Sequence, residues 1–328
     1  MQYTSDSFPI QDLLIDIHPK TKKLVPWREK RLQAEKMAEA HIRISQKDDI
    51  FINRSSKIYE CATFLQFKRF VDTGERKLFR SFFCKYRLCP ICMWRRSLKI
   101  FSQTSLILNE SIKQGFQHLF LSLTAKNCQL PELGSALDHF QTSIHDRFIR
   151  TKRFKNAITG WIRVFEVTHN IDKYSPSFDT FHHHAHMMLQ VRPSYFGKNY
   201  IKQSEFQDMW KVAAGLDYDP SVDIRKIDRK NNGDIKEISK YIAKPGDILV
   251  DDYDMTDRTV KSLDSALYQR RMVSLGGNLK TIKKQLKLDD MEDGNLIVVD
   301  GEKINPELAF VLENYGWNAG FRQYMRKS

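Results

Sequence analysis

A predicted strand with histidines on one face is the strongest structural signal in the sequence. Residues 181–191 read FHHHAHMMLQV, in which His182, His183, His184 and His186 precede an apolar run. Successive side chains of a strand point to opposite faces, so His182, His184 and His186 share one face and His183 points away. Alternate residues lie about 7 Å apart, so either neighbouring pair, 182/184 or 184/186, can bind one ion. The spacing alone leaves both pairs open.

The segments around this strand predict the fold class. β-prone runs predict further strands over 118–127 and 160–170, and the second of these precedes the histidine strand as in a β-hairpin with a long loop. Periodicity and terminal glycines or prolines predict four helices between residues 97 and 244. Their ranges are 97–115, 133–154, 204–215 and 234–244, and 221–227 is predicted as an edge strand. We therefore predict an α+β fold, a mostly antiparallel sheet backed by helices.

Changes in composition predict four parts of the chain. Residues 1–56 form an N-terminal arm with one helical stretch, WREKRLQAEKMAEAHIRIS, and residues 57–100 form a basic, cysteine-rich module. Residues 101–250 hold the alternating strands and helices. An acidic stretch, DILVDDYDMTD, marks the start of a mainly helical C-terminal region over 251–328.

The charge distribution predicts a polyanionic partner. The chain has 53 Lys and Arg against 40 Asp and Glu, a formal net charge of +13. Residues 76–99 carry eight basic side chains and no acidic one, with aromatic residues interleaved, and further basic clusters lie at 147–155 and 269–287. This pattern suits a surface that binds phosphates and stacks on bases, although a solvated basic face would look the same.

Neither the start of the chain nor its hydropathy indicates a membrane. The first residues lack the basic and apolar regions of a signal peptide. No segment reaches the roughly 18 apolar residues of a membrane span. We expect a cytoplasmic protein with no membrane partner.

Four of the five cysteines predict a structural zinc site. Cys89 and Cys92 form the C-x-x-C pair CPIC, Cys84 lies five residues before it, and Cys61 lies further upstream. Disulfides are rare in the cytosol, so clustered thiols favour a metal, and four of them make a tetrahedral set. Cys61 is the ligand that the spacing supports least, and Cys128 is expected to be an ordinary thiol. The alternatives are redox chemistry at CPIC or buried, unreactive thiols.

The predicted helix 234–244 carries a third candidate group. Glu237, Tyr241 and Lys244 fall at i, i+4 and i+7 and therefore on one helical face. Tyrosine is one of the side chains that form covalent intermediates. Two imidazoles with a carboxylate or amide suit Mn²⁺ or Mg²⁺ with a position open for substrate. For the histidines, the alternative is that they only form hydrogen bonds. For Tyr241, the alternative is a half-buried surface residue without a catalytic role.

Three motifs, taken together, resemble a known family. FLSLTAKN (120–127), FHHHAHMML (181–189) and EISKYIAK (237–244) occur in the order found in the replication initiators (Rep proteins) of small rolling-circle plasmids, in the HUH endonuclease superfamily. The resemblance is to the type with one tyrosine and a glutamate one turn before it, and it covers most of residues 57–328. One departure is the His182–His183 pair, where related chains usually carry other residues.

The resemblance implies a fold and a set of metal ligands. Residues 101–250 would be an HUH nuclease domain, an antiparallel sheet with the metal-binding histidines on a central strand. The second motif selects His184 and His186, and Glu166 is the implied third ligand, with His169 as a weaker alternative.

The resemblance also implies roles for the third motif. Tyr241 would be the nucleophile that forms a 5′-phosphotyrosine, and Lys244 would stabilise charge on the phosphate. Lys240 would contact the DNA backbone, and Glu237 would activate water for hydrolytic termination.

The implied function is metal-dependent nicking of one strand at a plasmid's double-strand origin. The nick would occur in an exposed single-stranded segment, and the free 3′-hydroxyl would prime synthesis. The implied partners are origin DNA, single-stranded DNA at the nick, a host helicase and a host polymerase, and the sequence is compatible with a homodimer. Two rival interpretations are a conjugative relaxase and a zinc-containing DNA-binding regulator without catalysis. Relaxases usually carry their tyrosine near the N-terminus, whereas here it follows the histidines.

Overall fold

The computed structural model describes residues 12–19, 21–46, 49–197, 199–227, 233–240, 243–299 and 308–327. The chain divides into two compact units. The first unit contains residues 1–95 and 295–328, and the second contains residues 96–294. The boundary between them falls within a helix, α3 (Pro90–Lys113). None of the helices in the described ranges combines the length and the apolar character of a membrane span.

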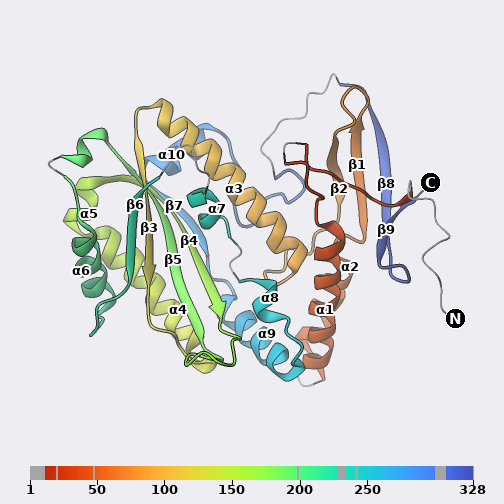
Figure 1. Cartoon of the computed structure of the whole chain (residues 1–328), viewed down its shortest axis with the longest axis horizontal. Coiled ribbons are helices and arrows are strands. Elements are labelled where there is room, and N and C mark those ends of the chain that lie inside the picture. The colour runs from red at the N-terminus through yellow and green to blue at the C-terminus, as the bar shows by residue number, and fades with distance from the viewer. Residues whose placement is uncertain are drawn as a thin grey trace. The chain divides into compact units, whose positions relative to one another are not determined.

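The first unit is a four-stranded antiparallel sheet with two helices (Figure 1). The strand order is β2-β1-β8-β9. The elements are α1 (Trp27–Ser45), α2 (Ile50–Glu60), β1 (Phe64–Phe70), β2 (Arg76–Ser81), β8 (Phe310–Asn318) and β9 (Gln323–Lys327). Trp27 of α1 packs edge-on against Phe67 of β1 and Trp94, with ring centroids 6.0 and 4.8 Å apart. The helix expected from WREKRLQAEKMAEAHIRIS is therefore α1, and it packs on the sheet instead of standing apart as an arm.

The C-terminal region differs from the prediction. Its first part is helical as expected, in α9 (Tyr253–Leu267) and α10 (Gly277–Gln285). Residues 310–327, however, form β8 and β9, and β8 pairs along the whole of β1 from Phe64↔Gly316 to Phe70↔Phe310. Local periodicity does not reveal this pairing because the partner strand lies near the other end of the chain. The expected boundaries at 56, 100 and 250 likewise do not coincide with those of the two units.

The second unit is a five-stranded antiparallel sheet with helices on both faces (Figure 1). Its strand order is β6-β3-β5-β4-β7, so the histidine strand β5 is central. The strands are β3 (Gln117–Thr124), β4 (Ile158–His169), β5 (Phe181–Val191), β6 (Val222–Lys226) and β7 (Val273–Gly276). The further helices are α4 (Leu133–Thr142), α5 (Lys152–Ala157), α6 (Gln203–Ala214), α7 (Gly233–Ile238) and α8 (Pro245–Ile248). The predicted strands, the hairpin pairing of β4 with β5 and the edge position of β6 are all observed.

Each face of this sheet has its own core. On one face, Ile107 of α3 and Ile282 of α10 join a buried cluster with Phe120, Ile162 and Met188 of the sheet. Ile235 and Ile238 of α7 belong to the same cluster. On the other face, Phe140 of α4 packs edge-on against Trp210 of α6, with centroids 5.0 Å apart. The mixed α+β class with antiparallel sheets is therefore confirmed.

The predicted helix 234–244 is shorter in the structure. α7 ends at Ile238, and the backbone N–H of Lys240 donates to the carbonyl of Glu237 in a last tight turn. Lys244 has extended backbone angles, φ −81° and ψ 128°, directly before Pro245. A proline ring disfavours helical angles in the residue before it, which explains why the helix cannot run to Lys244. Tyr241 and Ile242 lie outside the described residues.

Gly277 joins β7 to α10 at a point where no side chain fits. It has φ +58°, and a Cβ there would overlap the Thr159 carbonyl oxygen and crowd the Cα of Gly160. Gly215, after α6, has a similar φ of +62° but open space around it.

We expect Gly277→Ala to destabilise the protein more than Gly215→Ala. The left-handed backbone alone should cost Gly215→Ala about 1 kcal/mol, while the added backbone clash should bring Gly277→Ala to about 3 kcal/mol or more. Urea unfolding followed by circular dichroism measures both values. Equal losses of unfolding free energy would show that the close approach of α10 to β4 does not restrict the side chain at position 277.

Candidate active site and metal centres

The pairing of β4 with β5 brings a carboxylate and two imidazoles together. Glu166 lies directly opposite His184, and His186 lies two residues further along the same face. Glu166 Oε2 is 3.2 Å from His184 Nε2 and 3.5 Å from His186 Nε2. One ligand atom from each residue lies within 4.8 Å of the other two, so the three can hold a single metal ion.

The environment of Glu166 keeps it ionised. Its side chain is 4% exposed, against 12% for His184 and 8% for His186. Burial by itself would raise the pKa of Glu166, but the hydrogen bond with His184, the adjacent imidazole of His186 and the charge of Lys244 hold that pKa well below its ordinary value. A buried carboxylate that stays charged is suited to a cation.

The histidine nitrogens also fit a metal. His186 Nε2 is buried and has no hydrogen-bond partner among the described residues. A buried lone pair without a partner is costly, and a bound cation would satisfy it. Two imidazoles and one carboxylate are a donor set for divalent ions and leave positions open for a substrate.

Ser122 of β3 orients His186. The two residues are paired in the sheet, and Ser122 Oγ lies 3.0 Å from His186 Nδ1. Because Nδ1 is engaged by the hydroxyl, Nε2 is the nitrogen that faces Glu166. The ring of Phe120 packs on the same imidazole, with centroids 5.3 Å apart. Ser122 was not among the predicted site residues, although a serine within the apolar run FLSLT was a signal for it.

The remaining histidines of the strand do not join the cluster. His182 shares the face, but its Nδ1 lies 3.0 Å from Asn127 Oδ1 and its ring stacks on His184. His183 points to the opposite face, beside Cys128 and Phe140, where burial first and neighbouring histidine charges second lower its pKa to about 4. The pair beside Glu166 is therefore 184/186.

His169, the alternative ligand, lies elsewhere. Its Nε2 is 2.8 Å from Asp179 Oδ1, and its ring stacks on Phe181. It does not belong to either of the two groups among the described residues that could hold a metal ion.

Glu237 and Lys244, four residues before and three residues after Tyr241, both reach this cluster. Glu237 Oε1 lies 3.6 Å from His186 Nε2, and Glu237 also forms an ion pair with Lys240. Lys244 Nζ lies 3.4 Å from Glu166 Oε1. Tyr241 itself falls outside the described residues.

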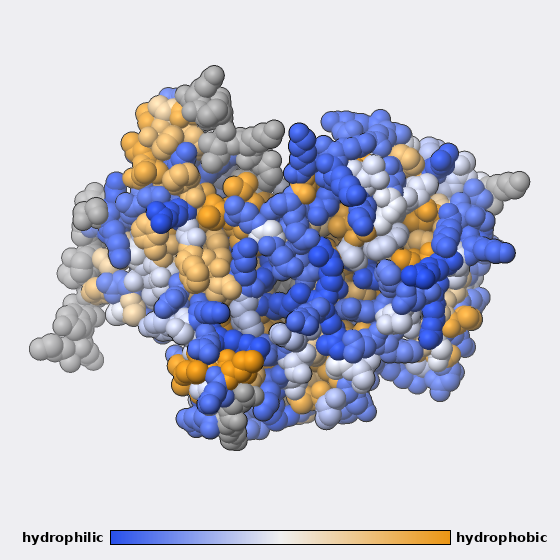
Figure 2. Space-filling model, turned by 180° about the vertical axis from the view of Figure 1, so that it is seen from behind, coloured by the Kyte–Doolittle hydropathy of each residue, from blue (hydrophilic) through white to orange (hydrophobic). Residues whose placement is uncertain are grey.

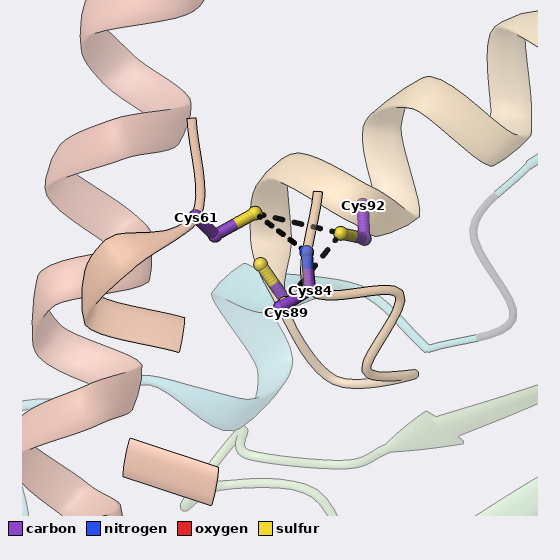
Figure 3. A group of neighbouring side chains, drawn as sticks. All are labelled: Cys61, Cys84, Cys89 and Cys92. Carbon is purple, nitrogen blue, oxygen red and sulfur yellow. Dashed lines mark hydrogen bonds between the residues drawn. The ribbon is translucent and has the colours of Figure 1, made fainter. Parts of the chain in front are cut away.

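The four cysteines form a second cluster, within the first unit (Figure 3). Cys61 follows α2, Cys84 follows β2, and Cys89 and Cys92 lie at the start of α3. The sulfur of Cys92 is 3.6 Å from those of Cys61 and Cys84. Sulfurs around a tetrahedral zinc ion are about 3.8 Å apart, given Zn–S bonds of about 2.3 Å. All four thiols are free of disulfides, and the set, Cys61 included, can hold a metal.

Two side chains that donate to backbone carbonyls, Arg31 and Tyr324, hold the loop that carries Cys61. The guanidinium of Arg31, which is fully buried, donates to the carbonyls of Tyr59 and Cys61 at the end of α2. The hydroxyl of Tyr324 donates to the carbonyl of Ala62 at 2.7 Å. Ala62 has φ +55°, a left-handed conformation that these contacts maintain. Nothing in the local sequence indicated Arg31 or Tyr324, because both lie far from the cysteines along the chain.

Comparisons with known proteins identify the family. The family model Rep_1, described as "Replication protein", matches residues 75–325. The chain belongs to this family. A "Protein rep" of Bacillus amyloliquefaciens is 37% identical over 94% of this chain and 95% of its own length. A "Protein rep" of Streptococcus pneumoniae is 34% identical over 92% of each chain. No solved structure matches the chain.

For this Rep_1 protein we expect one tightly bound metal ion at the cysteine cluster. Cys89→Ser should remove that metal and lower the melting temperature, because a structural metal contributes its binding energy to folding. Elemental analysis of the purified protein together with thermal unfolding measures both effects. Cys128→Ser is the matched control, since Cys128 is buried beside Phe181 and His183 and does not belong to the cysteine cluster. A parent protein without metal would rule the site out.

Proposed function

We propose that this chain initiates plasmid rolling-circle replication by nicking one strand of origin DNA through a covalent tyrosine intermediate. The observation that carries the proposal is the cluster of Glu166, His184 and His186 with Glu237 and Lys244 against it. Glu237 and Lys244 bracket Tyr241 in the sequence by four and three positions. Membership of the Rep_1 replication family and the central position of the histidine strand support the same proposal.

In the proposed reaction, Tyr241 is the nucleophile. Its phenolate attacks the scissile phosphorus, the bond to the 3′-oxygen breaks, and the products are a 5′-phosphotyrosine and a free 3′-hydroxyl. A divalent cation such as Mn²⁺ or Mg²⁺ held by Glu166, His184 and His186 would polarise the phosphate. Lys244 places a positive charge beside the same site and would stabilise charge on the phosphate oxygens. The phosphodiester energy remains in the covalent link, so strand rejoining needs no nucleotide cofactor.

The cysteine cluster has a structural role in this proposal. Zinc is the ion that the Cys₄ set favours, because four thiolates close its coordination and leave no position for a substrate. It would fix the start of α3, where Arg95 and Arg96 are buried and donate to backbone carbonyls. Exposed basic side chains elsewhere, as in the clusters at 147–155 and 269–287, would give affinity for the plasmid's double-strand origin. A host helicase and polymerase would extend the nicked strand.

We expect His184→Ala and His186→Ala to abolish nicking while duplex origin binding stays largely intact. The imidazoles act at the scissile phosphate, whereas affinity comes from dispersed basic contacts. The assay incubates the protein with Mn²⁺ and a labelled single-stranded origin oligonucleotide and measures the denaturant-resistant adduct, which Tyr241→Phe must also eliminate. His182→Ala is the matched control and should be milder, because His182 contacts Asn127 on the same face. A Tyr241→Phe protein that nicks normally would instead favour a DNA-binding regulator without catalysis.

We expect Glu237→Gln to preserve adduct formation but suppress hydrolytic release at termination. The carboxylate lies beside His186 and can act as a general base toward water, which the amide cannot. The measurement is the ratio of released to covalently bound DNA at saturating oligonucleotide. Lys240→Gln is the control, since it breaks the Glu237–Lys240 ion pair but keeps the carboxylate. If both variants release less DNA than the parent, and by the same amount, Glu237 acts only through that ion pair.

A further inference from the structure

The two faces of the four-stranded sheet in the first unit differ in chemistry. Alternation and register place Phe67 and Tyr315 on the face that packs on α1, with their rings 6.0 Å apart. Glu313 lies on this same face, where it forms ion pairs with Arg69 and Arg76 at 2.8 and 2.6 Å. Glu313 is the one acidic residue in the four strands. The opposite face, which we call the open sheet face, therefore receives no carboxylate from β1, β2, β8 or β9.

A β-bulge adds side chains to the open sheet face. The register of β1 with β2 shifts between Gln66↔Arg80 and Phe67↔Leu78, so Phe79 is the extra residue. A bulge allows two successive side chains to point to one side of a sheet. Arg80 pairs with Gln66 on the open face, and the ring of Phe79 lies 4.4 Å from Lys68 Nζ on that face.

The open sheet face combines cations with exposed aromatic rings. Its defining residues are Lys68, Lys77, Arg80, Lys327, Phe79 and Phe310. Phe79 and Phe310 are 44% and 40% exposed, and Lys68 Nζ lies between them, 4.0 Å from the ring centre of Phe310. Gly316 leaves room for the Lys327 side chain to lie along the sheet, since a Cβ there would overlap it.

The exposed apolar surface is concentrated toward one end of this sheet. Val71, in the β1–β2 turn, is 56% exposed, and Leu312 of β8, which pairs with Lys68 on the open sheet face, is 48% exposed. Figure 2 shows orange, hydrophobic side chains at the β1–β2 hairpin end of the unit, at the upper left, as well as other orange and pale areas on this side of the molecule. Large apolar side chains that gather on an exposed surface commonly mark a binding site.

We propose that the open sheet face binds single-stranded DNA, with bases stacked on Phe79 and Phe310 and phosphates on the surrounding cations. Lys68, Arg80 and Lys327, which receive no carboxylate from the strands on this face, complement a phosphate backbone. Exposed rings on a flat sheet suit unpaired bases, whose faces are free, whereas a duplex hides the faces of its bases. The inference rests on the proposed function in that it assumes a DNA substrate, and it adds a second DNA contact apart from the nicking residues.

The test measures binding of the full-length protein to a fluorescent oligo(dT) of about 15 nucleotides, by anisotropy and without added Mn²⁺ or Mg²⁺. The double variant F79A/F310A should bind at least about tenfold more weakly, because it removes two stacking platforms. Phe196→Ala is the matched control. Phe196 is 41% exposed and has Lys226 Nζ 4.9 Å from its ring, but it belongs to the second unit. The control should bind within about twofold of the parent.

A charge variant supplies an independent readout. Lys68→Gln should lower the slope of log affinity against log salt by about 0.7, the value for one phosphate contact on a single strand. Unchanged oligo(dT) affinity in F79A/F310A would overturn the proposal. A shift from dimer to monomer in sedimentation, with oligo(dT) affinity unchanged, would overturn it too and identify the face as a protein interface.

The same proteins separate this inference from the proposed function. A parent that forms no Tyr241 adduct but binds oligo(dT) through Phe79 and Phe310 contradicts the nicking proposal and supports the DNA-binding face. A parent that nicks, with F79A/F310A binding oligo(dT) as the parent does, contradicts the DNA-binding face alone.

Discussion

The register between β4 and β5 is the constraint on which the candidate active site depends. It sets Glu166 directly opposite His184 and places His186 on the same face. A shift of either strand by one residue would place Glu166 and the two histidines on opposite faces of the sheet, so that the shifted side chains would lie among Phe140, Phe165 and Trp210. The cores on both faces of the sheet prevent such a shift, because each core is filled by the alternate residues of each strand that point to its face.

The two candidate metal centres are built in different ways. The Glu166 cluster depends on strand pairing, so its geometry is set by backbone hydrogen bonds within one sheet. The cysteine cluster joins the end of α2, a loop and the start of α3, and no regular pairing sets its geometry. Its loop is held instead by side chains that reach backbone carbonyls, Arg31 from α1 and Tyr324 from β9. A bound metal would add the missing constraint among the four sulfurs.

The segment after α7 joins the fold to the proposed chemistry. Ile235 and Ile238 anchor α7 in the core, which brings Glu237, on the intervening turn, to His186. Pro245 then forces Lys244 out of a helical conformation, and from this extended backbone Lys244 reaches Glu166. The same short stretch thus contributes a carboxylate and an ammonium group to one site from two backbone conformations.

The sequence by itself determined what depends on neighbours along the chain. Alternation in FHHHAHMMLQV separated His183 from His182, His184 and His186, and the glycine after α6 ended that helix, as predicted. The α+β class followed from the same local patterns. The choice of the 184/186 pair and of Glu166 came from the family resemblance, and the register of two strands brings these residues together.

Only the tertiary structure decided the contacts between distant segments. β8 pairs with β1 across almost the whole chain, Arg31 supports Cys61, and Ser122 orients His186. The predicted helix over 234–244 was too long, because the helical periodicity of the sequence continues past Ile238, where α7 ends. Local patterns record which face of a strand or helix a residue occupies. They do not record which other segment packs there, because that choice depends on the burial and hydrogen bonding of the whole chain.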